Sequence, residues 1–354
     1  MPASRLISLD AFRGLTIAAM VLVNNPGSWR AIYAPLKHAD WHGLTPTDLI
    51  FPFFLFIVGV AIPLSRPAPG RVLRRAAIIA ALGIVLNGLP YFHWATLRIP
   101  GVLQRIAVCY LIAALLFLRT AWRTQAIVTA ALLLGYWALM TLVPVPGYGA
   151  GDLRPEANLA AWLDRAVLGP HVWRFARVYD PEGILSTVPA VATTLIGVLA
   201  GQWIRSERDS RTIVVGLVVS GALATAIGAA WGTVFPVNKA LWTSSYAVLT
   251  GGLALLVFAV CYWTIEIRRW QRWAMPFVVF GVNALLLFFL STLVARVLTL
   301  IDVGGVTLKD AIVERAFAPW ASPINASLAY AATYLAIWWL VMWVLYRAGV
   351  RLRA

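Results

Sequence analysis

The sequence is divided into ten blocks of predominantly apolar residues, and this pattern limits the possible folds more than any other feature. Each block is about 17 to 25 residues long, the length that an α-helix needs to cross a hydrocarbon core of about 30 Å. Backbone groups inside lipid must satisfy their own hydrogen bonds, so such blocks form helices. We therefore predict an all-α polytopic transmembrane bundle, with residues 1–354 as one domain and helices at 8–25, 46–65, 74–92, 100–118, 124–143, 183–204, 212–231, 241–265, 274–298 and 323–346.

The composition favours a membrane protein over a soluble domain. Hydrophobic residues make up 61% of the chain and charged residues 12%, whereas soluble domains carry about 25% charged residues. The formal net charge of +15 does not indicate nucleic-acid binding, because the basic clusters are short and lie at helix ends, as topology signals and lipid anchors do. Cys109 and Cys261 lie in separate apolar blocks and predict neither a disulfide framework nor a zinc site. The first block is expected to stay as a membrane anchor, because it continues without a short cleavable signal region.

The distribution of basic residues predicts the orientation. Ten crossings place both termini on one side of the membrane. With that side cytoplasmic, the inner segments hold 17 of the 29 Lys and Arg residues, as the positive-inside rule requires. The same segments hold four acidic residues: Asp10, Glu207, Asp209 and Glu266.

The predicted outer segments are the long ones, at about 26–45, 144–182 and 299–322. The second begins with turn residues at 145–152, and 159–168 is compatible with a short surface helix. All four histidines lie in outer segments or at outer helix ends: His38, His42, His93 and His171. We therefore expect the chemical groups of the protein on its non-cytoplasmic side.

The first outer loop allows three interpretations. His38, Asp40 and His42 alternate and could offer two imidazoles and a carboxylate to a metal, but no third histidine lies nearby. They are alternatively plain interfacial polar residues. In the third interpretation His38 is a proton acceptor, because an unperturbed histidine pKa of about 6.5 suits that role at neutral pH. Asp48 is equally compatible with a catalytic partner and with a helix cap, since Thr45 and the following proline form a capping-box-like start.

Polar residues inside apolar blocks are further candidates. Arg98, Gln104 and Arg105 place arginine and glutamine at and inside the start of a predicted helix. An intramembrane arginine is costly unless it is paired or faces a polar cavity, so it is a functional candidate. Asn283 in the ninth block either forms a hydrogen bond between helices or contacts a ligand.

Three shorter motifs have structural interpretations when taken alone. Asp10 and Arg13 lie three residues apart on one predicted helix, so they can form an ion pair; Arg13 near the inner surface could instead bind phosphate. The segments 180–183 and 235–239 are turn-and-cap sequences before predicted helices on the outer side.

Together these motifs resemble the heparan-α-glucosaminide N-acetyltransferase family of transmembrane acyltransferases, in a bacterial-type form. The resemblance extends over almost the whole chain. The motifs that carry it occur in this order: Arg5 to Gly14, Val21 to Asn24, Lys37 to Leu44, Asp48 to Pro52, Arg98 to Arg105, Asp180 to Gly183 and Pro236 to Trp242.

The resemblance implies an enzyme that takes an acetyl group from cytosolic acetyl-CoA and transfers it to an amino sugar or oligosaccharide on the far side of the membrane. It implies that His38 is catalytic, together with Asn24 and Asp48, whereas His42 stands where the family often has asparagine. No metal is expected. We expect contacts to acetyl-CoA from a further set of residues: Arg13, Arg98, Gln104, Arg105, Asn238, Lys239, Asn283 and Arg347.

These residue types suit the implied chemistry. His38 could accept the proton that an ammonium sugar must lose before its nitrogen attacks a thioester, or carry the acetyl group itself. Asn24 could donate a hydrogen bond to the developing oxyanion, and Asp48 could fix the imidazole tautomer.

Two other functions stay open at this point. A sugar permease is compatible with ten helices and buried polar groups. An O-acetyltransferase of a surface polysaccharide or peptidoglycan sugar would use the same donor. In each case the expected location is a bacterial inner membrane, with lipid as a partner, no nucleic acid, and a homodimer as an open possibility.

Overall fold

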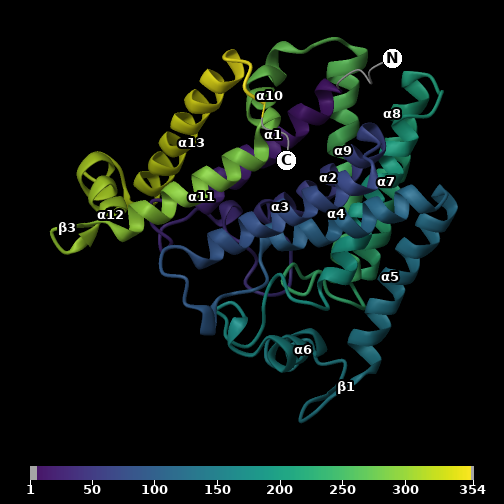
Figure 1. Cartoon of the computed structure of the whole chain (residues 1–354), viewed down its shortest axis with the longest axis horizontal. Coiled ribbons are helices and arrows are strands. Elements are labelled where there is room, and N and C mark those ends of the chain that lie inside the picture. Colours follow the sequence, from purple (N-terminus) through teal and green to yellow (C-terminus); the bar gives the residue numbers. More distant parts are fainter. Residues whose placement is uncertain (1–5, 352–354) are drawn as a thin grey trace.

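The computed structural model describes residues 6–351, which form a bundle of α-helices with two very short β-hairpins (Figure 1). The predicted all-α polytopic fold is confirmed. Arg5 and Arg353, which contribute to the charge distribution considered above, lie outside the described residues. The helices are α1 (Ile7–Asn24), α2 (Ile50–Ser65), α3 (Pro69–Gly88), α4 (Val102–Arg119), α5 (Trp122–Leu142), α6 (Leu159–Leu168), α7 (Thr187–Ile204), α8 (Ser210–Trp231), α9 (Ser244–Tyr262), α10 (Met275–Val282), α11 (Ala284–Leu300), α12 (Leu308–Ile312) and α13 (Pro323–Arg347).

Eight helices of the described chain are long and apolar enough to cross a membrane. They are α1, α2 with the turn before it (46–65), α4, α5, α7, α8, α9 with the turn after it (244–267) and α13. A ninth span results if α10 and α11, which are bent by 69° relative to each other, count as one. All ten predicted blocks contain helix. The remaining one, α3, is helical but carries three arginines in its first half: Arg71, Arg74 and Arg75.

Two predicted boundaries need correction. The third helix was expected at 74–92, but α3 covers Pro69–Gly88, because Pro69 suits the first helical turn and Pro90 keeps the residue before it out of the helical region. The ninth helix was expected to be continuous, but it breaks at Asn283, whose φ of −121° and ψ of 37° are not helical. The predicted helix at 159–168 is confirmed as α6.

The two hairpins are short surface features. Pro144–Val145 (β1) pairs antiparallel with Gly149–Ala150 (β2), within the segment predicted to turn, and Asp302–Val303 (β3) pairs with Val306–Thr307 (β4). Figure 1 shows α6 and β1 at the end of the molecule opposite to the start of α1.

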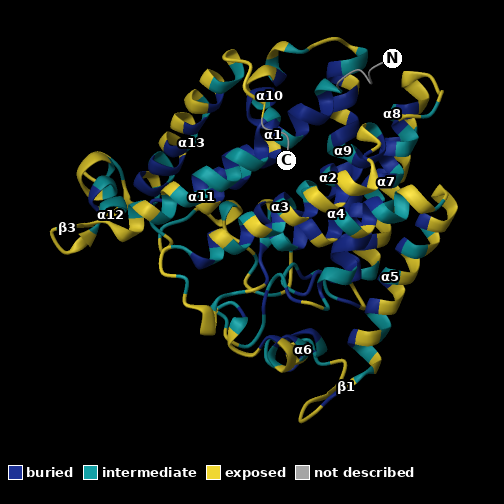
Figure 2. Cartoon of the chain, in the orientation of Figure 1, coloured by how far each residue is buried: buried dark blue, intermediate teal, exposed yellow. Residues whose placement is uncertain are grey.

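The centre of the bundle is built from α1, α2, α7 and α9 (Figure 2). In α1, α2 and α7, 67% of the most apolar 18-residue window is buried, against 22% in α8. The exposed residues of α8 include Val215, Val219 and Leu223. Apolar side chains on the outside of such a bundle are what a lipid environment favours, so α8 is a peripheral, lipid-facing helix.

Small residues allow α2 and α7 to approach closely. A Cβ atom on Gly59 would lie 2.0 Å from the carbonyl oxygen of Thr194, and one on Gly197 would lie 2.1 Å from that of Phe56. Close backbone contact of this kind is typical of packed membrane helices. It fixes α2 against the centre of the bundle, together with the preceding short 3-10 helix Pro46–Leu49 that carries Asp48.

Candidate functional site

His38 and Asp48 form a side-chain pair at the start of α2. Nδ1 of His38 lies 2.6 Å from Oδ1 of Asp48. The carboxylate is 1% exposed and the imidazole 49% exposed, so a buried anion orients a ring that is open on its other side. The two residues are in contact, as the suggested role of Asp48 requires, and their chemical roles stay a prediction.

Asp48 is also a helix cap. Its second oxygen, Oδ2, accepts hydrogen bonds from the backbone N–H of Ala39 (3.1 Å), the backbone N–H of Thr45 (3.0 Å) and the Thr45 hydroxyl (3.0 Å). The hydroxyl of Tyr246 in α9 donates to the Asp48 carbonyl (2.6 Å). The two interpretations of Asp48 therefore hold together, because one oxygen caps the helix and holds the loop while the other contacts the imidazole.

The segment between α8 and α9 packs onto the histidine loop. The backbone N–H of Gly43 donates to the carbonyl of Val237 (2.8 Å). The side-chain amide of Asn238 donates to Nδ1 of His42 (3.3 Å). Burial lowers the pKa of His42 below its ordinary value, which keeps this ring neutral and able to accept. Two motifs almost 200 residues apart in sequence thus form one surface.

Lys239 completes the cluster around His38. Its Nζ lies 2.9 Å from Nδ1 and 3.2 Å from Nε2 of His38, and 3.7 Å from Oδ1 of Asp48. Burial lowers the pKa of Lys239, although the carboxylates of Asp48 and Glu182 oppose this shift. Imidazole, carboxylate and amine are therefore in mutual contact.

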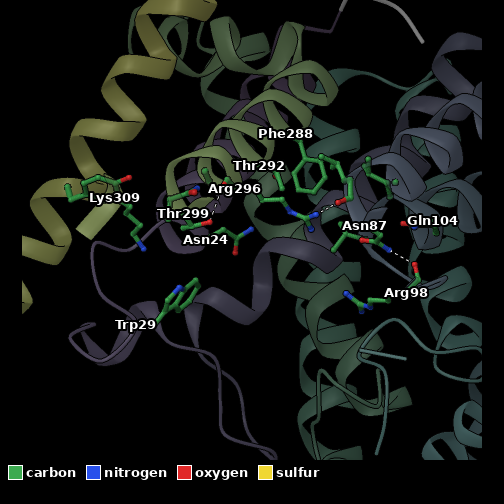
Figure 3. A pocket seen from close by; sticks show the side chains of 17 residues that line it. Asn24, Trp29, Asn87, Arg98, Gln104, Phe288, Thr292, Arg296, Thr299 and Lys309 are labelled. Carbon is green, nitrogen blue, oxygen red and sulfur yellow. Dashed lines mark hydrogen bonds between the residues drawn. The ribbon is translucent and has the colours of Figure 1, made fainter. Parts of the chain in front are cut away.

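A cavity of about 340 Å³ lies between α1, α3, α4, α11 and α13. Figure 3 shows Lys309 and Trp29 on one side of it and Arg98 and Gln104 on the other. Its lining residues are Asn24, Asn25, Trp29, Gly83, Leu86, Asn87, Arg98, Val102, Leu103, Gln104, Phe288, Thr292, Ala295, Arg296, Thr299, Lys309 and Tyr330.

The cavity is positively charged. Its lining includes Arg98, Arg296 and Lys309 and no acidic residue. In the described chain, Arg296 hydrogen-bonds the carbonyls of Leu86 and Leu89 and has no carboxylate within ion-pair distance. Such a lining attracts an anionic group and repels an ammonium group.

Arg98 connects the cavity wall to the turn before α7. Its guanidinium contacts Asp180 through two nitrogens (2.9 and 2.5 Å) and Glu182 through one (2.5 Å). Although burial opposes it, hydrogen bonds to Asp180 and attraction by Glu182 raise the pKa of Arg98. The segment 180–183, predicted as a turn, is thus held by an arginine 82 residues before it.

Arg105 is 2% exposed and lies above Trp242, with its guanidinium carbon 5.2 Å from the ring centroid. It donates to the carbonyl of Gly183 (3.2 Å) and to the hydroxyl of Ser186 (2.5 Å). These contacts give Nη2 the partners expected of an intramembrane arginine, whereas Nε and Nη1 have no hydrogen-bond partner among the described residues. Arg105 is absent from the cavity lining and joins α4 to the start of α7.

The residues predicted to contact acetyl-CoA do not form one group. Arg98 and Gln104 line the cavity, and Asn238 and Lys239 adjoin the histidine loop. Arg105 joins α4 to the start of α7, and the last three lie towards the opposite end: Arg13 pairs with Asp10 (3.0 Å), Asn283 donates to the carbonyl of Val350 (2.9 Å), and Arg347 lies over Trp343. Tyr330 in the cavity and Arg347 are 17 residues apart on α13, about 25 Å at 1.5 Å per residue.

Asn24 lines the cavity at the end of α1. In the part of the chain that the structure describes, it forms no hydrogen bond with His38, and His38 is not part of the cavity lining. The histidine cluster and the cavity are therefore two neighbouring features. Residues 6–351 also contain no group of three His, Cys, Asp or Glu side chains placed to hold a metal ion.

Sequence reasoning overlooked two cationic residues of the cavity. Arg296 lies inside the ninth apolar block, so the rule that selected Arg105 applies equally to it. Lys309 follows a β-turn in the third outer segment, and no sequence pattern indicated that it lines a cavity. Its position depends on how α12 packs near Tyr330, whose ring centroid lies 5.9 Å from the ammonium.

The sequence matches known proteins of one family. Residues 5–230 match the profile of the family described as heparan-alpha-glucosaminide N-acetyltransferase, catalytic. The chain is similar to the human heparan-alpha-glucosaminide N-acetyltransferase, with 29% identity over 352 residues, and to the mouse protein of the same name, with 28% identity over 357 residues. These alignments cover 80% and 81% of this chain and 52% and 53% of the relatives, so the chain spans about half the length of the curated relatives it matches.

Proposed function

The chain belongs to the heparan-alpha-glucosaminide N-acetyltransferase family, and we propose that it transfers an acetyl group from acetyl-CoA to the amino group of a sugar or oligosaccharide. The observation that carries this proposal is the contact between His38 Nδ1 and Asp48 Oδ1 (2.6 Å), in the part of the chain that matches the family profile. A buried carboxylate that fixes one ring nitrogen leaves the other nitrogen of the ring for chemistry.

The proposed reaction uses Nε2 of His38 as a general base. This nitrogen accepts a proton from the sugar ammonium, and the freed amine attacks the thioester carbonyl. The C–N bond forms, the C–S bond breaks, the imidazolium returns its proton to the departing thiolate, and the second ammonium proton leaves the new amide nitrogen for water. Asp48 keeps Nδ1–H in place and stabilises the charged ring. If His38 instead carries the acetyl group, the same Nε2 is the nucleophile.

The charge of the cavity supports binding of an anionic portion of a substrate. Arg296 and Lys309 suit a phosphate group of CoA or an acidic group of the sugar chain, because charge-assisted hydrogen bonds to such groups are strong. Asn24 on the cavity wall is the proposed donor to the oxyanion. We place the acceptor on the periplasmic side of a bacterial inner membrane. This assignment is tested by comparing acetyl transfer to an added acceptor in right-side-out and inverted vesicles.

The test is CoA release from acetyl-CoA by the purified protein in the presence of a glucosaminide. His38→Ala should reduce the rate by about 10²- to 10⁴-fold, the usual effect of losing a general base. His171→Ala is the matched control, because His171 contacts the carbonyl of Leu97 (2.7 Å) away from the cluster. Wild-type activity of His38→Ala would refute the assignment.

The same assay separates the rival functions. With a sugar permease, adding the acceptor would not cause CoA to be released from acetyl-CoA. An O-acetyltransferase would give an ester, which hydroxylamine cleaves, whereas the proposed amide product resists it. Mass spectrometry of protein quenched without acceptor detects acetyl-His38 if the residue is a carrier.

A further inference from the structure

Lys239 is held against His38 by a rigid turn. Within this turn, Oδ1 of Asn238 accepts from the backbone N–H of Leu241 (2.9 Å), and the backbone N–H of Asn238 donates to the Thr243 hydroxyl (3.0 Å). Trp242 has a φ of 51° and is 1% exposed. A buried residue in this uncommon backbone region indicates a turn that its surroundings fix. The position of Lys239 is therefore built into the fold.

The hydrogen-bond pattern assigns the proton on His38. Oδ2 of Asp48 accepts three hydrogen bonds, which identifies an ionised carboxylate, so Nδ1 of His38 carries the hydrogen directed at Oδ1. In the neutral ring Nε2 is then the nitrogen with a free lone pair. Nζ of Lys239 lies against the ring, 2.9 Å from Nδ1 and 3.2 Å from Nε2, and of these two nitrogens only Nε2 has a lone pair for the ammonium.

The charges around the ring come from several elements. Asp48 at the start of α2 favours an imidazolium, and the Lys239 ammonium opposes it. Glu182, from the turn before α7, acts on Lys239 and is itself bound by Arg98 (2.5 Å). The neighbouring titratable groups of the loop itself are Lys37, Asp40 and His42. Within this set Lys239 is the cation in direct contact with the ring.

We propose that Lys239 is a positioning residue of the transfer site, which holds His38 as the neutral Nδ1–H tautomer through its contacts with His38 and Asp48. This inference rests on the proposed function. The ammonium of Lys239 also marks the place against Nε2 where the ammonium of the acceptor must lie. The acceptor displaces Nζ, and Lys239 keeps its attraction to Oδ1 of Asp48, 3.7 Å away.

The test uses the full chain in detergent with ¹⁵N-labelled histidine. The protein has four histidines, so the His38 signal is identified by its loss in His38→Gln. Lys239→Met keeps the length of the side chain and removes its charge, and Lys239→Arg keeps the charge. In Lys239→Met we expect the ¹⁵N signals of the neutral His38 ring to change from the Nδ1–H tautomer towards a mixture of the two tautomers, because the cation beside Nε2 has gone.

The activity profile gives the second measurement. The value of kcat/KM should fall more in Lys239→Met than in Lys239→Arg, which keeps the charge beside the ring. An unchanged tautomer of His38 in a folded Lys239→Met protein, whose His171 signal is as in the wild type, would overturn the proposal. The spectroscopic measurement does not depend on turnover. If no acetyl transfer is found, the proposed function fails, and the His38 signal still decides whether Lys239 positions the ring.

Discussion

The side-chain amide of Asn238 donates a hydrogen bond to Nδ1 of His42, and this contact joins two loops whose residues are 196 positions apart. His42 therefore serves to dock the turn that carries Lys239 next to His38. The contact uses Nδ1 of His42 and supports the docking role.

We expect His42→Asn to retain transfer activity within about threefold, because an asparagine side-chain oxygen can accept the hydrogen bond from Asn238. His42→Ala leaves the buried amide of Asn238 without that partner, a loss that costs about 1–3 kcal/mol. Its melting temperature should fall and its activity should decrease more than that of His42→Asn. Equal behaviour of the two variants, measured by CoA release and thermal unfolding, would contradict the docking role.

Asp48→Asn should separate the two functions of this residue. The amide oxygen can still accept from Thr45, so the helix start should survive with little loss of stability. The charge that stabilises the imidazolium disappears, and the rate should fall by about 10²- to 10⁴-fold. Asp48→Ala removes the cap as well and should cost a further 0.5–2 kcal/mol or so in unfolding free energy. Thermal melts and rates of both variants check this, and a fully active Asp48→Asn would limit the residue to capping.

The cavity prediction concerns its unpaired cations. Arg296→Ala and Lys309→Ala should each weaken binding of an anionic ligand by about tenfold or more, the loss of one charge-assisted hydrogen bond. Arg211→Ala, an exposed position on α8, is the control. Calorimetry with acetyl-CoA, dephospho-CoA and a sulfated oligosaccharide identifies which anion the cavity accepts. Unchanged affinity for all three ligands in both variants would exclude an anion site here.

Gly59→Ala should destabilise the protein, because the new Cβ would lie 2.0 Å from the backbone oxygen of Thr194. Overpacking of this kind costs about 1–3 kcal/mol. Gly135 on α5 is the matched control, since a Cβ there meets nothing within 4 Å and alanine favours helix over glycine by about 1 kcal/mol. Thermal unfolding in detergent should therefore separate the two variants, and equal melting temperatures would contradict the close α2–α7 contact.

Stability should depend on pH through Asp164 in α6. Burial raises the pKa of this carboxyl to about 6, from 3.8. Because the folded-state pKa is the higher one, the contribution of Asp164 is fully present below about pH 4 and is lost as the pH rises through 6. The melting temperature of the wild type relative to Asp164→Asn should therefore increase as the pH falls from 7 to 5. A difference that does not change with pH would show that Asp164 does not titrate in this range.

The sequence by itself determined the class of fold and several local features. Hydrophobic blocks, basic clusters and the Thr45–Asp48 helix start depend on residues that are close in sequence, so their patterns are readable without a structure. The residues that carry the family resemblance included His38 and Asp48, which are in contact in the structure. The same local rule would also have selected Arg296, which was overlooked.

The tertiary structure decided which of these residues meet. The contact between Lys239 and His38 spans 201 positions, and the cavity combines residues from α1 to α13. Such contacts depend on helix packing, including the close approach at Gly59 and Gly197, and on the break at Asn283 that redirects α11 towards the cavity. Periodicity in a single chain records which residues face lipid or protein, but it does not record which distant loop each residue touches. For that reason eight predicted ligand contacts became separate groups once the helices were packed.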